Sequence, residues 1–200
     1  MVLGSGSVFN WGRTHHKSRV MLKIILRYGV IGGLIVGGAL SAVSLGVGQD
    51  IGSTWSYLVG YLTMLVGLST IFIAIKRHRD TALGGVIRFW PALGIGLGIS
   101  FIAGIFYVLA WEAVLYFGHL DFGGDYAKAM IEAAKAKGLS GEQLAKAVAE
   151  AEQFKTMYAN PLYRLPETFI EIFPVGVLVS LVSAALLRNS RFLAARRNPG

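Results

Sequence analysis

The sequence predicts an all-α, polytopic membrane protein with four transmembrane helices and a helical hairpin in the outer loop between the third and the fourth. Three observations support this fold class. Of the 200 residues, 54% are hydrophobic and only 15% are charged, and the mean hydropathy of +0.57 is too high for a soluble domain of this size. Four apolar stretches each provide the roughly 20 residues that a helix needs to cross a bilayer. Basic residues gather in alternate connecting segments, as they do in a chain threaded through a membrane.

The four predicted spans contain no lysine or arginine. Each is too long for the apolar core of a cleaved signal peptide, so the first is expected to be a signal anchor. The spans cover residues 28–48, 55–75, 89–117 and 168–187. They form a predicted membrane domain over 21–190, whose outer segment is 118–166, and this domain is flanked by a flexible N-terminal tail (1–20) and a basic C-terminal tail (191–200).

The distribution of charge predicts that both termini are cytoplasmic, because lysine and arginine concentrate in the cytoplasmic flanks of membrane spans. The basic residues on this side of the alternating topology are opposed there only by Asp80, and they are Arg13, Lys17, Arg19, Lys23, Arg27, Lys76, Arg77, Arg79, Arg88, Arg188, Arg191, Arg196 and Arg197. Topology therefore accounts for the net charge of +8. No nucleic-acid-binding module is visible, so the expected partner is the lipid bilayer and not a nucleic acid.

The outer segment, 118–166, is neutral and rich in alanine. Its first half has helical charge spacing and reaches a stop at Gly138, and its second half opens with Ser140 and Gln143 at the spacing of a capping box. These features predict the helical hairpin. Two interpretations stay open for it: a polar cap that packs on the outer mouth of the bundle, or a docking surface for an envelope protein partner.

Small residues recur at every fourth position in two of the spans. Such spacing lets helix backbones approach closely in lipid, so these residues are predicted to pack helices together. The residues concerned are Gly29, Gly33, Gly37 and Ser41 in the first span, and in the third Gly94 with Gly98, and Gly96 with Ser100 and Gly104. The contacts can lie within one chain or between the chains of a homo-oligomer, and the sequence does not separate the two.

The sequence offers little for catalysis or metal binding. It contains no cysteine, and none of the spans contains an aspartate or a histidine that could serve a serine or aspartate protease within the bilayer. His15 and His16 are adjacent in the predicted tail, and His119 with Asp121 follows the third span; these are expected to be solvated. We therefore expect no enzyme, no catalytic residue, no cofactor and no metal.

Two acidic residues near the outer ends of the spans are the candidate functional groups. Glu112 lies in the third span, and Glu171 lies in the fourth, one turn beyond Glu167 and three residues before Pro174. One interpretation joins Glu112, Glu171 and His119 in a polar pocket at the outer mouth. The other leaves both carboxylates facing interfacial water, with Glu167 in the first helical turn after Pro166.

Two stretches resemble the family of bacterial inner-membrane proteins grouped as domain of unknown function 4199. The residues that carry the resemblance, over about 21–190, are Arg79, Asp80, Gly84, Gly85, Phe89, Asn160, Pro161, Glu171, Pro174 and Gly176. The resemblance implies a multi-pass protein of the bacterial inner (plasma) membrane, with four helices and an outer helical segment. It brings no activity, substrate or catalytic residue. The first twenty residues fall outside it, so we expect either a flexible tail or a true start at Met21.

Together, these observations favour an integral membrane protein that is not an enzyme and that assembles with itself or with an envelope partner. The alternative is a small transporter or channel subunit that uses the carboxylate pocket. The two hypotheses rest on different residues: the glycine spacing favours assembly, whereas Glu112 and Glu171 favour transport.

Overall fold

The computed structural model describes residues 11–44, 46 and 52–194, with side chains described from residue 19 in the first helix and from residue 58 in the second. This part of the chain contains six α-helices and no strands. They are α1 (Trp11–Ser44), α2 (Gly52–Ala82), α3 (Phe89–Phe117), α4 (Phe122–Ala136), α5 (Gly141–Ala159) and α6 (Pro161–Leu187). The all-α fold class is confirmed, and α1, α2, α3 and α6 are each long and apolar enough to cross a membrane.

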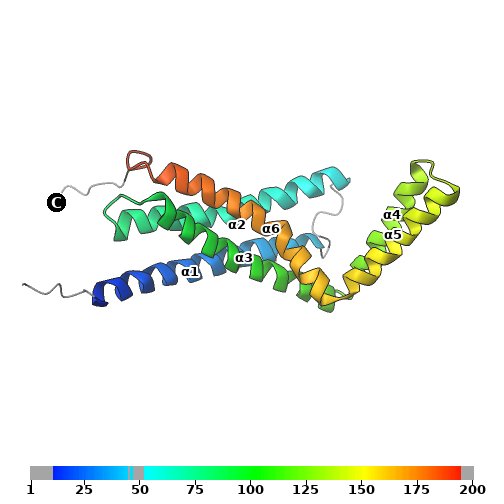
Figure 1. The fold of residues 1–200 in the computed structure, drawn as a ribbon, viewed down its shortest axis with the longest axis horizontal. Coiled ribbons are helices and arrows are strands. Elements are labelled where there is room, and N and C mark those ends of the chain that lie inside the picture. Colours follow the sequence, from blue (N-terminus) through cyan, green and yellow to red (C-terminus); the bar gives the residue numbers. More distant parts are fainter. Residues whose placement is uncertain (1–10, 45, 47–51, 195–200) are drawn as a thin grey trace, which may run out of the picture.

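Figure 1 shows α1, α2, α3 and α6 as an elongated bundle, with α4 and α5 extending from one end of it. α3 packs extensively against both α1 and α6, and α2 packs against α1, α6 and α3. α4 and α5 pack mainly on each other. We call the end of the bundle next to α4 and α5 the α4–α5 end, and the opposite end, where α1 begins and α6 finishes, the terminal end.

α6 begins seven residues before the predicted start of the fourth span. Its N-cap is Asn160, whose side-chain oxygen accepts a hydrogen bond from the Leu162 amide at 3.0 Å, and Pro161 occupies the start of the helix. Pro166 consequently lies inside the helix together with Pro174, and not in its first turn as the sequence interpretation had it. A favourable cap further upstream thus moves the helix start.

The first helix also differs from the predicted boundaries. α1 begins at Trp11, inside the predicted flexible tail, and its apolar part is Arg19–Ser44. The side chains of His15 and His16, and all of residues 1–10 and 195–200, lie outside the described part of the chain.

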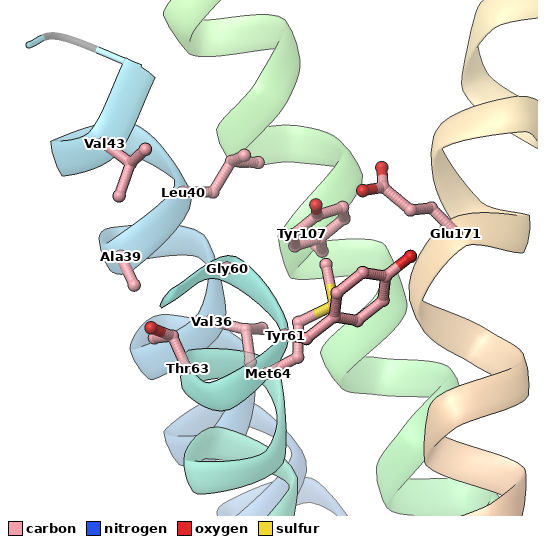
Figure 2. A pocket seen from close by; sticks show the side chains of 10 residues that line it. All are labelled: Val36, Ala39, Leu40, Val43, Gly60, Tyr61, Thr63, Met64, Tyr107 and Glu171. Atoms are coloured by element: carbon pink, nitrogen blue, oxygen red, sulfur yellow. The ribbon is translucent and has the colours of Figure 1, made fainter. Parts of the chain in front are cut away.

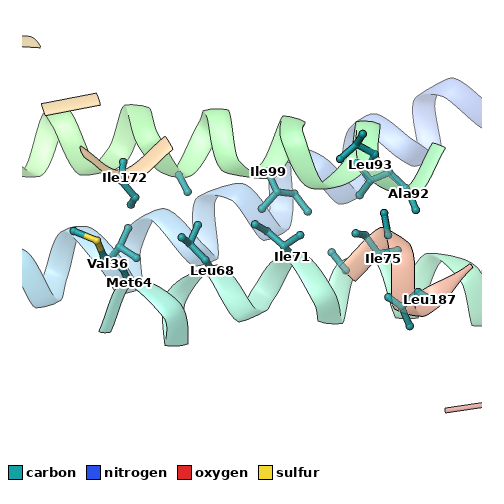
Figure 3. Close-up of a cluster of buried hydrophobic side chains, with 14 of the residues drawn as sticks. Val36, Met64, Leu68, Ile71, Ile75, Ala92, Leu93, Ile99, Ile172 and Leu187 are labelled. Carbon is teal, nitrogen blue, oxygen red and sulfur yellow. The ribbon is translucent and has the colours of Figure 1, made fainter. Parts of the chain in front are cut away.

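The centre of the bundle is a column of aliphatic side chains. Leu68, Ile71 and Ile75 of α2 are fully buried, and they lie with Ile99 of α3 and Ile172 of α6 in the cluster shown in Figure 3. The outward faces are apolar as well, with exposed residues such as Leu34, Leu62, Val66, Leu109 and Leu178. Apolar surface on both the inside and the outside of the helices suits a bundle that is surrounded by lipid.

The glycines of α1 let this helix approach α3 closely. A Cβ atom at Gly29 would lie 2.7 Å from the Cβ of Ile102, and one at Gly33 would lie 2.5 Å from the Cβ of Phe106. Gly37 faces Ala110 in the same way. The α1 glycines therefore pack helices within the chain.

Gly94 and Gly98, two of the predicted packing glycines of α3, have different surroundings. Gly98 faces Ile25 of α1, where an added Cβ would lie 2.9 Å from the nearest side-chain atom. A Cβ at Gly94 would meet nothing within 4 Å. Only Gly98 is therefore part of the α1–α3 contact.

Small residues also form the crossing of α3 and α6. Gly96 lies against Ser180, and Gly176 lies against Ser100, so each helix presents a glycine to a serine of the other. The two serine Oγ atoms are 3.2 Å apart, and each hydroxyl donates to the carbonyl four residues before it. Polar groups at this crossing are thereby satisfied inside the bundle.

Candidate functional site

Glu112 is held in an ion pair at the α4–α5 end of the bundle. The Arg164 guanidinium donates from Nε to Oε1 at 2.7 Å and from Nη2 to Oε2 at 2.6 Å, which is a bidentate arrangement. Arg164 also donates to the Tyr158 carbonyl at 3.1 Å. This pairing balances the charge of Glu112, so its carboxylate is engaged in joining α3 to α6.

Aromatic side chains surround this ion pair and fasten α4 and α5 to the bundle. The Trp111 indole donates to the Tyr158 hydroxyl at 2.7 Å, and the Arg164 guanidinium lies over the Tyr158 ring. The Phe122 ring lies 5.2 Å from Trp111 and 5.1 Å from Tyr158 between ring centroids. Burial raises the pKa of Tyr158, which keeps its hydroxyl protonated. We call these residues, with Glu112, the outer joint.

A cavity of about 230 Å³ lies between α1, α2, α3 and α6, closer to the α4–α5 end. Its lining is mostly apolar, and it consists of Val36, Ala39, Leu40, Val43, Gly60, Tyr61, Thr63, Met64, Tyr107 and Glu171. Figure 2 shows that the Glu171 carboxylate and the hydroxyls of Tyr107 and Tyr61 point toward one another at one side. The other side is formed by the aliphatic residues of α1. The cavity thus has one polar side and one apolar side.

The polar side of the cavity is open to the surroundings of the bundle. Tyr61 is 55% exposed and Glu171 is also exposed, whereas Tyr107 is buried. Thr63 contributes no free donor, because its hydroxyl donates to the Val59 carbonyl at 2.7 Å. A molecule entering the cavity would therefore meet one carboxylate and two phenols.

Glu171 lies well inside α6. It is ten residues from the start of the helix at Pro161, or about 15 Å along the axis at about 1.5 Å per residue. It is seven residues deeper than Arg164, or about 10 Å by the same rise. Among the described residues, none of the ion pairs includes Glu171. A carboxylate within a membrane helix and without a partner cation is costly, and such residues commonly serve function.

His119 lies elsewhere, in a separate hollow at the end of α3 formed by residues 115–117 and 119–121. Its backbone has a φ of +50°, which turns the chain from α3 toward α4. Asp121 caps α4 by accepting a hydrogen bond from the Gly124 amide at 3.0 Å. Within the described part of the chain, His119 and Asp121 are not joined by a third residue into a group that could hold a metal.

The three residues of the predicted pocket therefore occupy three places. Glu112 is in the outer joint, His119 is in the turn after α3, and of the three only Glu171 lines the cavity. Glu112 does not join Glu171 because Arg164, one helical turn into α6, reaches the Glu112 carboxylate and neutralises it.

The sequence interpretation missed Tyr61 and Tyr107, although a signal for them exists. Tyr107 lies ten residues before the end of α3, Glu171 lies ten residues after the start of α6, and Tyr61 lies nine residues after the start of α2. All three helix termini belong to the α4–α5 end, so the three residues have similar depth. Matching polar residues by depth would have grouped them.

A second charged cluster lies at the terminal end. The side chain of Arg79 is fully buried, and it donates from Nε to Asp80 at 2.7 Å, and from its Nη atoms to the carbonyls of Phe192 at 2.9 Å and Leu193 at 2.7 Å. Lys76 also pairs with Asp80, at 2.6 Å. We call these residues the inner clamp, because they hold the segment after α6 against α2.

Four long apolar helices with apolar outward faces define a polytopic membrane protein. The chain belongs to the DUF4199 family of proteins of unknown function, whose model matches residues 27–189. The predicted family is thereby confirmed. Neither a curated protein nor a solved structure matches the chain. The family description names no activity, so the function has to be argued from the geometry.

Proposed function

We propose that this protein is a non-enzymatic membrane component that binds a small molecule in the cavity between α1, α2, α3 and α6, as the binding subunit of a small transporter or channel. The convergence of Glu171, Tyr107 and Tyr61 on a cavity with otherwise apolar walls carries the proposal. Concave, mainly apolar sites with a few convergent polar groups are typical of small-molecule binding. The opening beside Glu171 and Tyr61 gives a ligand access.

The proposed setting is the bacterial inner membrane, with the terminal end in the cytoplasm. The basic flanks of α1, α2, α3 and α6 lie toward the terminal end, which supports this orientation by the positive-inside rule. The cavity would then lie in the outer half of the membrane, and α4 and α5 would extend outside it.

The absence of catalysis remains a proposal, supported by the chemistry of the cavity. Its polar groups are one carboxylate, two phenols and a threonine hydroxyl that is bonded to the backbone. These lining residues include no serine, cysteine, histidine or lysine. Binding and release are the simplest use of such a set.

A cavity-filling variant tests the binding function. Gly60 lines the cavity, and a Cβ there would meet nothing within 4 Å, so Gly60→Phe places a ring at the wall of the cavity without a backbone clash. Gly94→Phe is the matched control, because Gly94 has similar open space but does not line the cavity. Saturation-transfer NMR with benzyl alcohol as the probe, on protein in lipid nanodiscs, is expected to show binding that Gly60→Phe abolishes and Gly94→Phe retains. Equal binding by all three proteins would contradict the proposal.

A second candidate function is assembly with an envelope partner through α4 and α5. The supporting observation is that this pair extends away from the bundle and is fixed to it by the outer joint. Self-assembly through the glycines has less support, because Gly29, Gly33, Gly37 and Gly98 are occupied by contacts within the chain.

Crosslinking in native membranes separates these forms of assembly. The chain has no native cysteine, so single cysteines at exposed Glu150 of α5 and at Gly94 of α3 report on the two surfaces cleanly. Crosslinks from residue 150 to another protein would favour an envelope partner. Crosslinks between two copies at residue 94 would favour a homo-oligomer, and a lone monomer in both cases would remove the second candidate.

A further inference from the structure

Glu171 lacks the ionic partner that the buried and half-buried charged groups of the bundle have. Arg79 is paired with Asp80 and with the backbone carbonyls of Leu187, Phe192 and Leu193, and Glu112 is paired with Arg164. Glu171 lines a cavity whose lining residues include neither lysine nor arginine. Within the described residues, Glu171 is therefore an acidic group of the bundle that has no cationic partner.

The lining disfavours anions, calcium and magnesium as ligands. An anion would meet the Glu171 carboxylate without a basic residue to attract it. Calcium takes six to eight oxygen ligands and magnesium near-ideal octahedral oxygen coordination, but the cavity offers one carboxylate and the two phenols. A small organic cation needs only one opposite charge and can use the faces of aromatic rings.

The size and the walls of the cavity indicate the rest of the ligand. A volume of about 230 Å³ exceeds the cavity of about 150 Å³ that is known to hold benzene, so it has room for an aromatic or branched aliphatic group and a head group. Val36, Leu40 and Met64 form apolar walls across from Glu171. The ligand should therefore have an apolar body with a positive charge at one end.

We propose that the cavity binds a small organic cation, with its ammonium group at Glu171, between Tyr61 and Tyr107, and its apolar body against α1. This inference rests on the proposed binding function and specifies its ligand class. The amine can belong to a free molecule or to the head group of a membrane lipid, because both present the same chemistry to the carboxylate.

Two probes of similar size and different charge test the ligand class. Benzyltrimethylammonium carries the charge, and benzyl alcohol is neutral. In nanodiscs made only of phosphatidylglycerol, Glu171→Gln is expected to weaken binding of the cation about tenfold more than binding of the neutral alcohol, since it removes the opposite charge. Glu171→Asp keeps the charge and is expected to retain most of the cation affinity. If Glu171→Gln does not fold, Glu171→Met, which also removes the charge and keeps a side chain of similar length, makes the same comparison.

The outcomes separate the ligand class from the binding function. If both probes bind the parent protein and are lost in Gly60→Phe, but Glu171→Gln binds the cation as the parent does, the cation proposal is overturned and the binding function stands. If neither probe binds the parent, both are overturned. Loss of cation binding in Glu171→Asp, which keeps the charge, would also count against the charge as the deciding feature.

A change of lipid identifies the source of the amine. If a lipid head group occupies the cavity, adding phosphatidylethanolamine to the nanodiscs should weaken benzyltrimethylammonium binding in the parent. The same addition should have no effect on the residual binding in Glu171→Gln. An unchanged affinity in the parent would support a free organic cation.

Discussion

The inner clamp and the cavity are two regions of one bundle that treat a charged side chain in opposite ways. At the inner clamp, Arg79 is fully buried, and its guanidinium donates to the Asp80 carboxylate and to the carbonyls of Phe192 and Leu193. At the cavity, Glu171 faces two phenols and an opening, without a partner cation among the described residues. The protein itself supplies the partners of Arg79, whereas Glu171 has no cationic partner in the described bundle.

This difference separates structural charge from functional charge. A buried ion with a full set of hydrogen bonds fixes the elements around it, and removing one partner leaves the others without compensation. A charge that the fold leaves unpaired in a membrane helix does not stabilise the fold, and such a residue commonly serves function. Substitutions should therefore affect stability most at the inner clamp and least at Glu171.

The largest effect is expected for Arg79→Met. The substitution leaves the carbonyls of Phe192 and Leu193 without their donor, and the loss of a buried, hydrogen-bonded ion typically costs about 3–5 kcal/mol. Thermal unfolding of purified protein in detergent measures the change. Arg77→Met is the matched control, because Arg77 is exposed two residues earlier on α2, and it should change little. Equal behaviour of the two variants would show that the inner clamp is not structural.

A smaller but clear loss is expected for Gly33→Leu. Its Cβ would collide with the Cβ of Phe106, which belongs to the α3 helix and cannot move without shifting the helix. Overpacking of this kind costs about 1–3 kcal/mol. Gly38→Leu is the control, because Gly38 is on α1 and a Cβ there would meet nothing within 4 Å. If Gly33→Leu is as stable as the parent, the α1–α3 contact is not packed as described.

A still smaller loss of stability is expected when the ion pair of the outer joint is broken. Glu112→Gln removes one half of a bidentate ion pair whose side chains are 15% and 30% exposed, so solvent screens part of the interaction and about 1–2 kcal/mol is expected. Protease sensitivity of α4 and α5, together with thermal unfolding, measures it. Exposed Glu150→Gln on α5 serves as the control. An unchanged protease pattern would indicate that the aromatic contacts hold the joint alone.

The smallest effect on stability is expected for Glu171→Gln. The substitution keeps the shape of the side chain and removes a charge that lacks a partner cation in the described bundle, so the unfolding free energy should stay within about 0.5 kcal/mol or rise. Thermal unfolding without added ligand is the measurement. A loss as large as that of Arg79→Met would mean that Glu171 is structural, and the contrast between the two regions would disappear.

The fold could be predicted in most respects because its signals are local. Hydropathy and length predicted four spans, and α3 has the predicted bounds of 89–117. Gly138 ends the α4 region with a φ of +77°, as its position suggested. The boundaries of α6 were harder to predict, because Asn160 and Pro161 compete with Pro166 as a helix start, and only the complete structure shows which cap is used.

The sequence by itself determined the family, the membrane class and the presence of Glu171 within an apolar helix. The tertiary structure decided which charged groups find partners: Glu112 receives Arg164 from α6, whereas Glu171 receives Tyr107 from α3 and Tyr61 from α2. It also decided that Gly29, Gly33 and Gly37 of α1 face α3. The physical reason is that burial in lipid depends on the composition of each helix alone. Pairing depends on which faces of different helices meet and at what depth, and side chains far apart in the sequence fix that geometry.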